Sequence, residues 1–130
     1  MIVDDDGFDA MAIRSIIESY ELSAEVFYNG VDCITELNNR KDNKCGEKCE
    51  GYKLIILDCN MPMMNGIECS KRIKQMINSK AIGETLVVGC TAYASEERVK
   101  ECLMAGMHAV LKKPVKREEL LKYMLKAEIL

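Results

Sequence analysis

Residues 54–66 read LIILDCNMPMMNG, an unbroken apolar run that ends on a carboxylate and passes into a stretch with proline and glycine. The run Leu54-Ile55-Ile56-Leu57 has no polar alternation, which is typical of a strand covered on both faces of a parallel sheet. Proline and glycine after it predict a loop and then the start of a helix. Asp58 therefore ends a buried strand, where an ionised side chain is costly and needs a reason.

Strands and helices alternate on both sides of this stretch. Apolar β-favouring runs predict strands at 2–3, 24–28, 54–57, 86–88 and 109–111. Helices are predicted around 13–20, over 31–39, after Gly66, after a capping Ser95, and over 117–127. In the last two helices we expect these apolar residues to face inward: Val99, Cys102 and Leu103, then Leu121, Met124 and Leu125.

Five strand–helix units in succession predict an α/β fold. The expected architecture is a doubly wound five-stranded parallel sheet with helices on both faces and right-handed crossovers. In such sheets, ligands bind outside the carboxyl ends of the strands, where the winding direction reverses. A functional site is therefore expected at that edge.

Polar residues follow the predicted strands at that edge. They are Asp4, Asp5 and Asp6 after the first strand, Asp58 after the third, Thr91 after the fourth and Lys113 after the fifth. Crowded carboxylates repel one another and raise each other's pKa values unless a cation lies among them. Mg²⁺ suits such a site, because it accepts one or two carboxylates directly and leaves positions for other oxygen ligands.

Length and composition predict a single domain, residues 1–130, of ordinary soluble character. Hydrophobic residues make up 48% and charged residues 30% of the chain. The net charge of -3 gives no basic face for direct binding to nucleic acid. The sequence has no apolar run of the roughly 18 residues that a membrane span needs, and no secretory signal. We expect a cytoplasmic domain that makes no membrane contact.

The seven cysteines are odd in number, and most lie in apolar periodic stretches, which favours reduced thiols over a disulfide framework. Cys45 and Cys49 differ, because they lie in the polar stretch 41–51. A Cys-x-x-x-Cys pair could hold half of a zinc site, but neither a second pair nor a nearby histidine is there to complete one. Their role stays open.

The chain resembles the receiver domain family of two-component response regulators across essentially its whole length. Four motifs carry the resemblance, in the family's order. They are Val3-Asp4-Asp5-Asp6, the stretch DCNMPMMNG at 58–66 that is similar to D-x-x-M-P-x-M-x-G, Thr91-Ala92, and Lys113-Pro114. The resemblance implies the flavodoxin-like strand order 2-1-3-4-5.

The resemblance also implies a role for each site residue. Asp58 is the nucleophile that accepts a phosphoryl group from phosphohistidine. Asp5 and Asp58 bind Mg²⁺ directly, Asp4 supports it through water, and Asn60 lends its backbone carbonyl. Thr91 and Lys113 hold the phosphoryl oxygens. The implied partner is a histidine kinase or a histidine phosphotransfer domain, and the implied output is a movement of the loop after the fourth strand with the helix behind it.

Three residues qualify the resemblance. Val110 stands three residues before Lys113, where the family often has an aromatic switch, so that switch is missing. Tyr93 lies in the loop that would cover the phosphoryl group, either as a shield against water or as an exposed loop residue. His108, the only histidine, precedes the fifth strand, away from the acidic edge, which argues against a role as phosphodonor.

Other functions stay open beside the phosphoacceptor. A pseudo-receiver would act only as a protein-binding module, independently of phosphorylation. A phosphatase of the aspartyl-phosphate type is less consistent, because Asn60 stands where a second acid is needed; we therefore expect no enzyme in the ordinary sense. The first strand is short before the acids, and the stretches 89–94 and 107–115 resemble receivers of hybrid sensor kinases. We expect an excised part of such a kinase, with a free-standing receiver as the second possibility.

Overall fold

The structure is a computed structural model that describes residues 1–42, 51–61 and 64–129. Its elements in chain order are β1 (Ile2–Val3), α1 (Gly7–Glu18), β2 (Val26–Phe27), α2 (Gly30–Asp42), β3 (Leu54–Asp58), α3 (Gly66–Asn78), β4 (Leu86–Thr91), α4 (Glu96–Met104), β5 (Ala109–Lys112) and α5 (Arg117–Lys126). No helix among the described residues has both the length and the apolar character to cross a bilayer.

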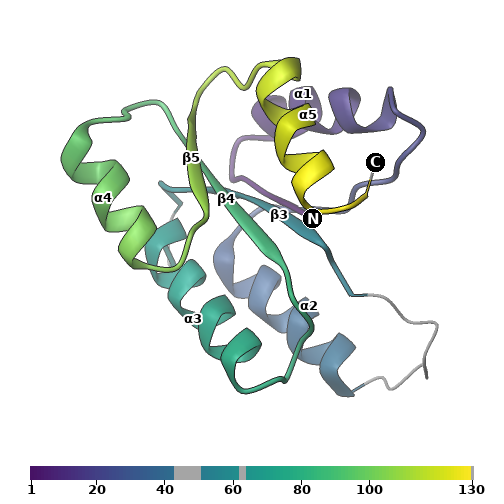
Figure 1. Cartoon of the computed structure of the whole chain (residues 1–130), viewed down its shortest axis with the longest axis vertical. Helices are drawn as coiled ribbons and strands as arrows, with labels where there is room; N and C mark the ends of the chain where they lie inside the picture. Colours follow the sequence, from purple (N-terminus) through teal and green to yellow (C-terminus); the bar gives the residue numbers. More distant parts are fainter. Residues whose placement is uncertain (43–50, 62–63, 130) are drawn as a thin grey trace.

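The five strands form one parallel sheet in the order β2-β1-β3-β4-β5, which confirms the predicted architecture. Helices α1 and α5 cover one face, and α2, α3 and α4 lie on the other side (Figure 1). Each face has its own apolar core. β2 is shorter than predicted, because only Val26 and Phe27 pair with β1.

β3 lies at the centre of the sheet and fixes the position of Asp58. Its five residues are all buried, and it pairs with β1 on one side and β4 on the other. Ile55 and Leu57 pack towards α2 and α3, whereas Leu54 and Ile56 pack towards α1 and α5. This two-sided burial explains the unbroken apolar run, and it makes Asp58 the end of a fully buried central strand.

The inward faces of the last two helices differ from the predicted ones. In α4, Cys102 is buried as expected, but Leu103 is 46% exposed. In α5 the buried residues are Leu120 and Met124, one helical turn apart, and Leu125 is 53% exposed. Adjacent residues of a helix point about 100° apart. When only a narrow stripe of the helix is buried, the residues next in sequence to the buried ones are therefore exposed to solvent. The predictions for Leu103 and Leu125 were wrong for this reason.

Gly66 lets α3 begin directly against the strand that carries Asp58. Its backbone N–H donates to the carbonyl of Cys59 at 3.2 Å, and Asn65 caps the helix by accepting from the N–H of Glu68 at 2.9 Å. A Cβ on residue 66 would collide with the backbone of Asp58 and Cys59. Since the obstacle is backbone, the collision cannot be relieved by turning a side chain.

We predict that Gly66→Ala lowers the free energy of unfolding by about 1–3 kcal/mol, which is the usual cost of overpacking. Gly83→Ala is the matched control, because no atom of residues 1–42, 51–61 or 64–129 beyond its chain neighbours lies within 4 Å of a Cβ built there. Urea denaturation followed by circular dichroism measures both variants. Equal stability of Gly66→Ala and Gly83→Ala would contradict this explanation of Gly66.

Candidate functional site

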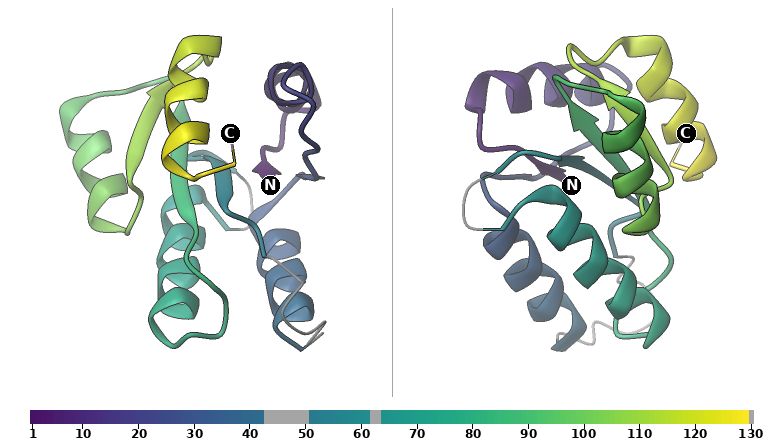
Figure 2. Two further views of the ribbon diagram at one scale, coloured as in Figure 1. Left: turned by 45° about the vertical axis from the view of Figure 1, so that its right-hand side comes forward. Right: turned by 90° about the vertical axis from the view of Figure 1, so that its left-hand side faces the viewer.

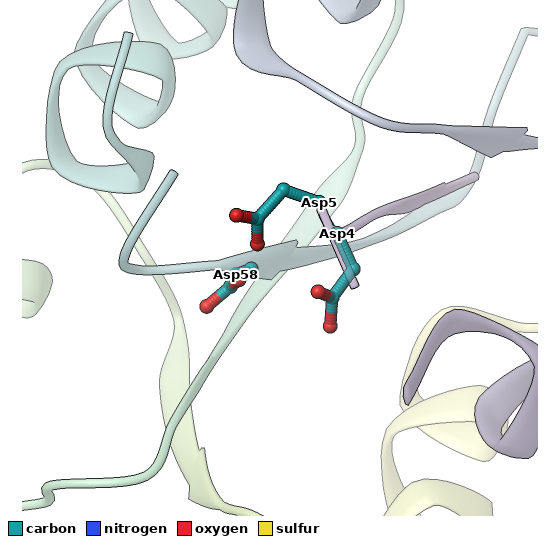
Figure 3. A group of neighbouring side chains, drawn as sticks. All are labelled: Asp4, Asp5 and Asp58. Carbon is teal, nitrogen blue, oxygen red and sulfur yellow. The ribbon is translucent and has the colours of Figure 1, made fainter. Parts of the chain in front are cut away.

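Two buried carboxylates lie at the carboxyl ends of neighbouring strands. Asp4 follows β1 and is 1% exposed, and Asp58 is the last residue of β3 and is 4% exposed. The register that pairs Val3 with Leu57 places them side by side. Figure 3 shows Asp4, Asp5 and Asp58 gathered at this edge of the sheet. One carboxylate oxygen from each of the three lies within 4.8 Å of the others.

Asp5 and Asp6 have different environments although both are exposed. Asp5 belongs to the acidic group with Asp4 and Asp58. Asp6 caps α1, because its Oδ1 accepts from the N–H groups of Phe8 at 2.8 Å and Asp9 at 3.3 Å. The Asp-Asp-Asp run therefore divides into two members of the acidic group and one helix cap.

Lys113 supplies a positive charge to this edge. Its Nζ lies 3.0 Å from Asp4 Oδ2, 3.0 Å from Asp9 Oδ2 and 3.5 Å from Asp58 Oδ1. Its backbone N–H donates to the carbonyl of Thr91 at 2.9 Å, and the Lys113-Pro114 peptide bond is cis. Burial by itself lowers the pKa of Lys113, but the surrounding carboxylates outweigh it and raise the pKa above its usual value. The ammonium is charged at any physiological pH.

The acidic group holds more negative charge than Lys113 can balance. Within the described residues, Lys113 is the one cation in ion-pair contact with Asp4 and Asp58. Asp4 Oδ1 accepts from the N–H of Asp6 at 2.9 Å, and within the described residues the Lys113 ammonium at 3.0 Å is the one partner of its buried Oδ2. A cluster of hard oxygen donors that carries more negative charge than its one lysine balances fits Mg²⁺.

Burial raises the pKa of the Asp58 carboxyl to about 7. The N–H of Asn60, which donates to Asp58 Oδ1 at 3.1 Å, opposes the rise, and so does the charge of Lys113. Asp4 adds to the rise through its negative charge, and Asp5 does so through a hydrogen bond. A cation bound beside Asp58 would favour the ionised form and lower this pKa.

The Thr91 hydroxyl, at the end of β4, is engaged in a local turn. Thr91 is fully buried, and its Oγ1 donates to the carbonyl of Tyr93 and accepts from the N–H of Tyr93, both at 3.1 Å. Tyr93 itself is 82% exposed. Thr91 lies at the predicted edge, but its hydroxyl has to leave this turn before it can bind anything placed on Asp58.

Sequence reasoning missed two residues at this edge, Asp9 and Arg98. Asp9 in α1 accepts a hydrogen bond from Lys113 at 3.0 Å. Arg98 in α4 donates to Asn60 Oδ1 at 2.5 Å and to the carbonyl of Cys59 at 3.3 Å. Each residue lies three positions after its helix cap, in the first turn of a helix that begins at this edge of the sheet. A polar residue at such a position borders the crevice, and this is the sequence signal that could have identified both.

The remaining predicted residues lie elsewhere. His108 precedes β5, and its Nδ1 accepts from the N–H of Val87 at 3.1 Å. Val110 is partly buried against the core on the side of α2, α3 and α4. Five cysteines are buried as free thiols, namely Cys33, Cys59, Cys69, Cys90 and Cys102. Cys45 and Cys49 lie outside the described residues, as do Pro62 and Met63 of the motif after Asp58.

The profile of the response regulator receiver domain family matches residues 1–125. The autoinducer 2 sensor kinase/phosphatase LuxQ of Vibrio vulnificus is 29% identical over 120 residues, which are 92% of this chain and 12% of that protein. The osmosensing histidine protein kinase SLN1 of Saccharomyces cerevisiae is 29% identical over 126 residues, 92% of this chain and 9% of that protein. The two-component response regulator 24 of Arabidopsis thaliana is 29% identical over 124 residues, 93% and 77% of the two chains.

Solved receiver domains have the same fold. A CheY-like receiver domain protein from Methanospirillum hungatei superposes with a TM-score of 0.78 at 25% identity, covering 98% of this chain and 90% of that one. The receiver domain of sensor histidine kinase PA1611 from Pseudomonas aeruginosa, with a magnesium ion coordinated in its active-site cleft, gives a TM-score of 0.77 at 22% identity over 96% and 92% of the chains. This chain spans about an eighth or less of the sensor kinases that it matches.

We predict that Asp58→Asn stabilises the metal-free protein at about pH 8 by roughly 2–4 kcal/mol. The pKa of Asp58 rises from 3.8 to about 7 on folding, so between these values the folded state binds the proton more tightly. The stability of the wild type therefore falls as the pH rises through this window, and the uncharged amide removes that loss.

Thermal melts at about pH 4 and pH 8 with a chelator present measure the effect. The gain should be large at pH 8 and small at pH 4. Asp6→Asn, which exchanges one capping side chain for another, should show no comparable gain. The same gain at both pH values would contradict the raised pKa of Asp58.

Proposed function

The chain belongs to the response regulator receiver domain family, and on that premise we propose that residues 1–130 act as one phosphoacceptor domain in a histidine-to-aspartate phosphorelay. The observation that carries the proposal is the buried Asp58 at the end of β3, with Asp4 and Asp5 beside it and Lys113 within 3.5 Å. A single acid at the end of a strand is often explained by a structural role in a turn or a helix cap. Such a role does not explain a group of buried carboxylates around a lysine.

The proposed reaction moves a phosphoryl group from nitrogen to oxygen. A carboxylate oxygen of Asp58 forms a bond to phosphorus while the phosphorus–nitrogen bond of a phosphohistidine breaks, and the departing imidazole takes up a proton. The product on Asp58 is an acyl phosphate. Catalysis of phosphoryl transfer consists mainly of positioning and charge neutralisation. The domain turns over no free substrate in this scheme.

In this proposal Asp5, Asp58 and the backbone carbonyl of Asn60 hold Mg²⁺, and Asp4 supports it through water. Bound there, the ion would neutralise charge on the carboxylates and on the phosphoryl oxygens. Two observations support this assignment: the three carboxylates outnumber the one lysine beside them, and the PA1611 receiver domain has a magnesium ion in its active-site cleft.

We propose that Lys113 and Thr91 bind the phosphoryl oxygens. Lys113 Nζ already lies next to Asp58 and stays charged. Thr91 reaches the group only when its hydroxyl leaves the turn with Tyr93, so phosphorylation draws the 91–95 segment inward, with α4 behind it. Val110 lacks the ring of an aromatic switch on β5, so the output is carried by this segment and α4.

The proposed partner is a histidine kinase or a histidine phosphotransfer domain, and the parent protein is proposed to be a hybrid sensor kinase. Support for both comes from the matched relatives, among which are LuxQ and SLN1. No described feature of the domain favours the pseudo-receiver, because Asp5, Asp58, Thr91 and Lys113 are all present at the edge of the sheet.

We predict that acetyl phosphate with Mg²⁺ adds one phosphoryl group to the wild type and none to Asp58→Asn. The amide is nearly isosteric, so the fold persists, but it cannot act as the nucleophile. Intact-mass spectrometry measures the product. Asp6→Asn, which alters the cap of α1 and not the acidic group, should be labelled as the wild type is. Labelling of Asp58→Asn would show that the acceptor is another residue, and an unlabelled wild type would favour the pseudo-receiver.

We also predict that saturating Mg²⁺ raises the melting temperature of the wild type and that Asp5→Ala reduces this rise. A ligand that binds only the folded state at about 100 times its dissociation constant adds about 2.7 kcal/mol of stability. Asp6→Ala is the control: it loses a helix cap and melts lower, yet it should keep the full response to Mg²⁺. Equal responses of Asp5→Ala and the wild type would remove Asp5 from the metal site.

A further inference from the structure

Helix α4 is weakly anchored to the rest of the domain. Figure 2 shows it at the outer edge of the molecule beside β5. Cys102 is the one α4 side chain that is buried by the described residues, and Leu103 and Met104 are exposed. Because so little apolar surface fixes α4, single polar contacts contribute a large share of what holds it in place.

Arg98 makes the charged contact that joins α4 to the loop after the acceptor strand. A second, buried contact joins the same two segments, because Cys102 Sγ of α4 lies 3.5 Å from Cys59 Sγ. From the first turn of α4 its Nη2 reaches the loop after β3, where it donates to Asn60 Oδ1 at 2.5 Å and to the Cys59 carbonyl at 3.3 Å. Its Nη1 lies 3.6 Å from Glu101 in the same helix. Hydrogen bonds from a charged donor are the stronger kind, and this guanidinium contacts two acceptors at once.

This contact continues to the phosphoacceptor itself. The N–H of Asn60, whose side chain binds Arg98, donates to Asp58 Oδ1 at 3.1 Å. Two residues thus link α4 to Asp58 on one side of the crevice. On the other side, the turn between Thr91 and Tyr93 leads through residues 91–95 into the cap of the same helix, where Ser95 accepts from the N–H of Arg98 at 3.2 Å.

We propose that Arg98 is a positioning residue that latches α4 to the loop after Asp58 in the unphosphorylated domain and releases it on phosphorylation. The release step rests on the proposed function; the latch itself does not. When Thr91 leaves its turn to bind a phosphoryl oxygen, the 91–95 segment moves and carries the first turn of α4 with it. Arg98 cannot then keep both of its bonds to Asn60 and Cys59.

Amide hydrogen exchange of the unphosphorylated protein tests the latch. Arg98→Met keeps an unbranched apolar stem but removes both hydrogen bonds, and exchange in α4 should become about tenfold faster, which corresponds to about 1.4 kcal/mol. Arg14→Met is the matched control, because the one partner of Arg14 among the described residues is Glu18, on an exposed face of α1. It should leave α4 exchange unchanged, and core amides of β3 should exchange alike in all three proteins.

A double-mutant cycle shows whether Asn60 is the partner. Asn60→Ala removes the side-chain acceptor and keeps the backbone. It should speed α4 exchange as well, and the double variant should be little faster than Arg98→Met alone. Fully multiplicative effects of the two changes would overturn the Arg98–Asn60 contact as the latch.

Beryllofluoride with Mg²⁺, a stable mimic of the phosphoryl group, tests the release. It should change α4 exchange in the wild type, and much less in Arg98→Met, where the helix is already free, although acetyl phosphate still labels Asp58 in that variant. This reduced response is a readout that a merely structural role would not give. A full-sized response in Arg98→Met, or unchanged α4 exchange in its unphosphorylated form, would overturn the latch. An unlabelled wild type would instead overturn the proposed function.

Discussion

The structure depends on one electrostatic constraint: Asp4 and Asp58 are buried side by side at the end of the sheet and share the ammonium of Lys113. Burying carboxylates is unfavourable unless they are paired, and one lysine does not neutralise two buried acids together with Asp9. Burial first, and then the negative charge of Asp4, raises the pKa of Asp58. A cation bound among these carboxylates would offset their excess negative charge.

The rest of the fold divides into a rigid part that holds this site and a less anchored part that can respond to it. β3 is buried along its length, and α3 begins against its backbone because residue 66 is glycine, so Asp58 is held firmly. Thr91 and α4 are held by the turn with Tyr93 and by the contacts of Arg98. Rigid placement of the proposed phosphoacceptor beside a weakly held helix suits a domain that converts a chemical change into a change of shape.

The sequence predicts those features that depend on the order of the elements. Because parallel strands end at one edge of a sheet, the sequence predicted that four side chains meet there, namely Asp4, Asp58, Thr91 and Lys113. The observed strand order is also the one that the resemblance implied. Asp9 and Arg98 were missed, because their roles depend on how far a side chain reaches from one helix to another segment, which periodicity does not encode. The inward faces of α4 and α5 were partly wrong because several apolar residues competed for a narrow buried stripe.

The central claim is that this buried carboxylate forms the acyl phosphate, and chemical trapping tests it most directly. Borohydride reduces an acyl phosphate to an alcohol, so a phosphorylated aspartate becomes homoserine at the position that carried the group. Peptide sequencing by mass spectrometry, after acetyl phosphate, Mg²⁺ and borohydride treatment of the wild type, reads that position. The account predicts homoserine in place of Asp58 and unmodified Asp4 and Asp5. Homoserine at another aspartate, with Asp58 intact, would contradict it.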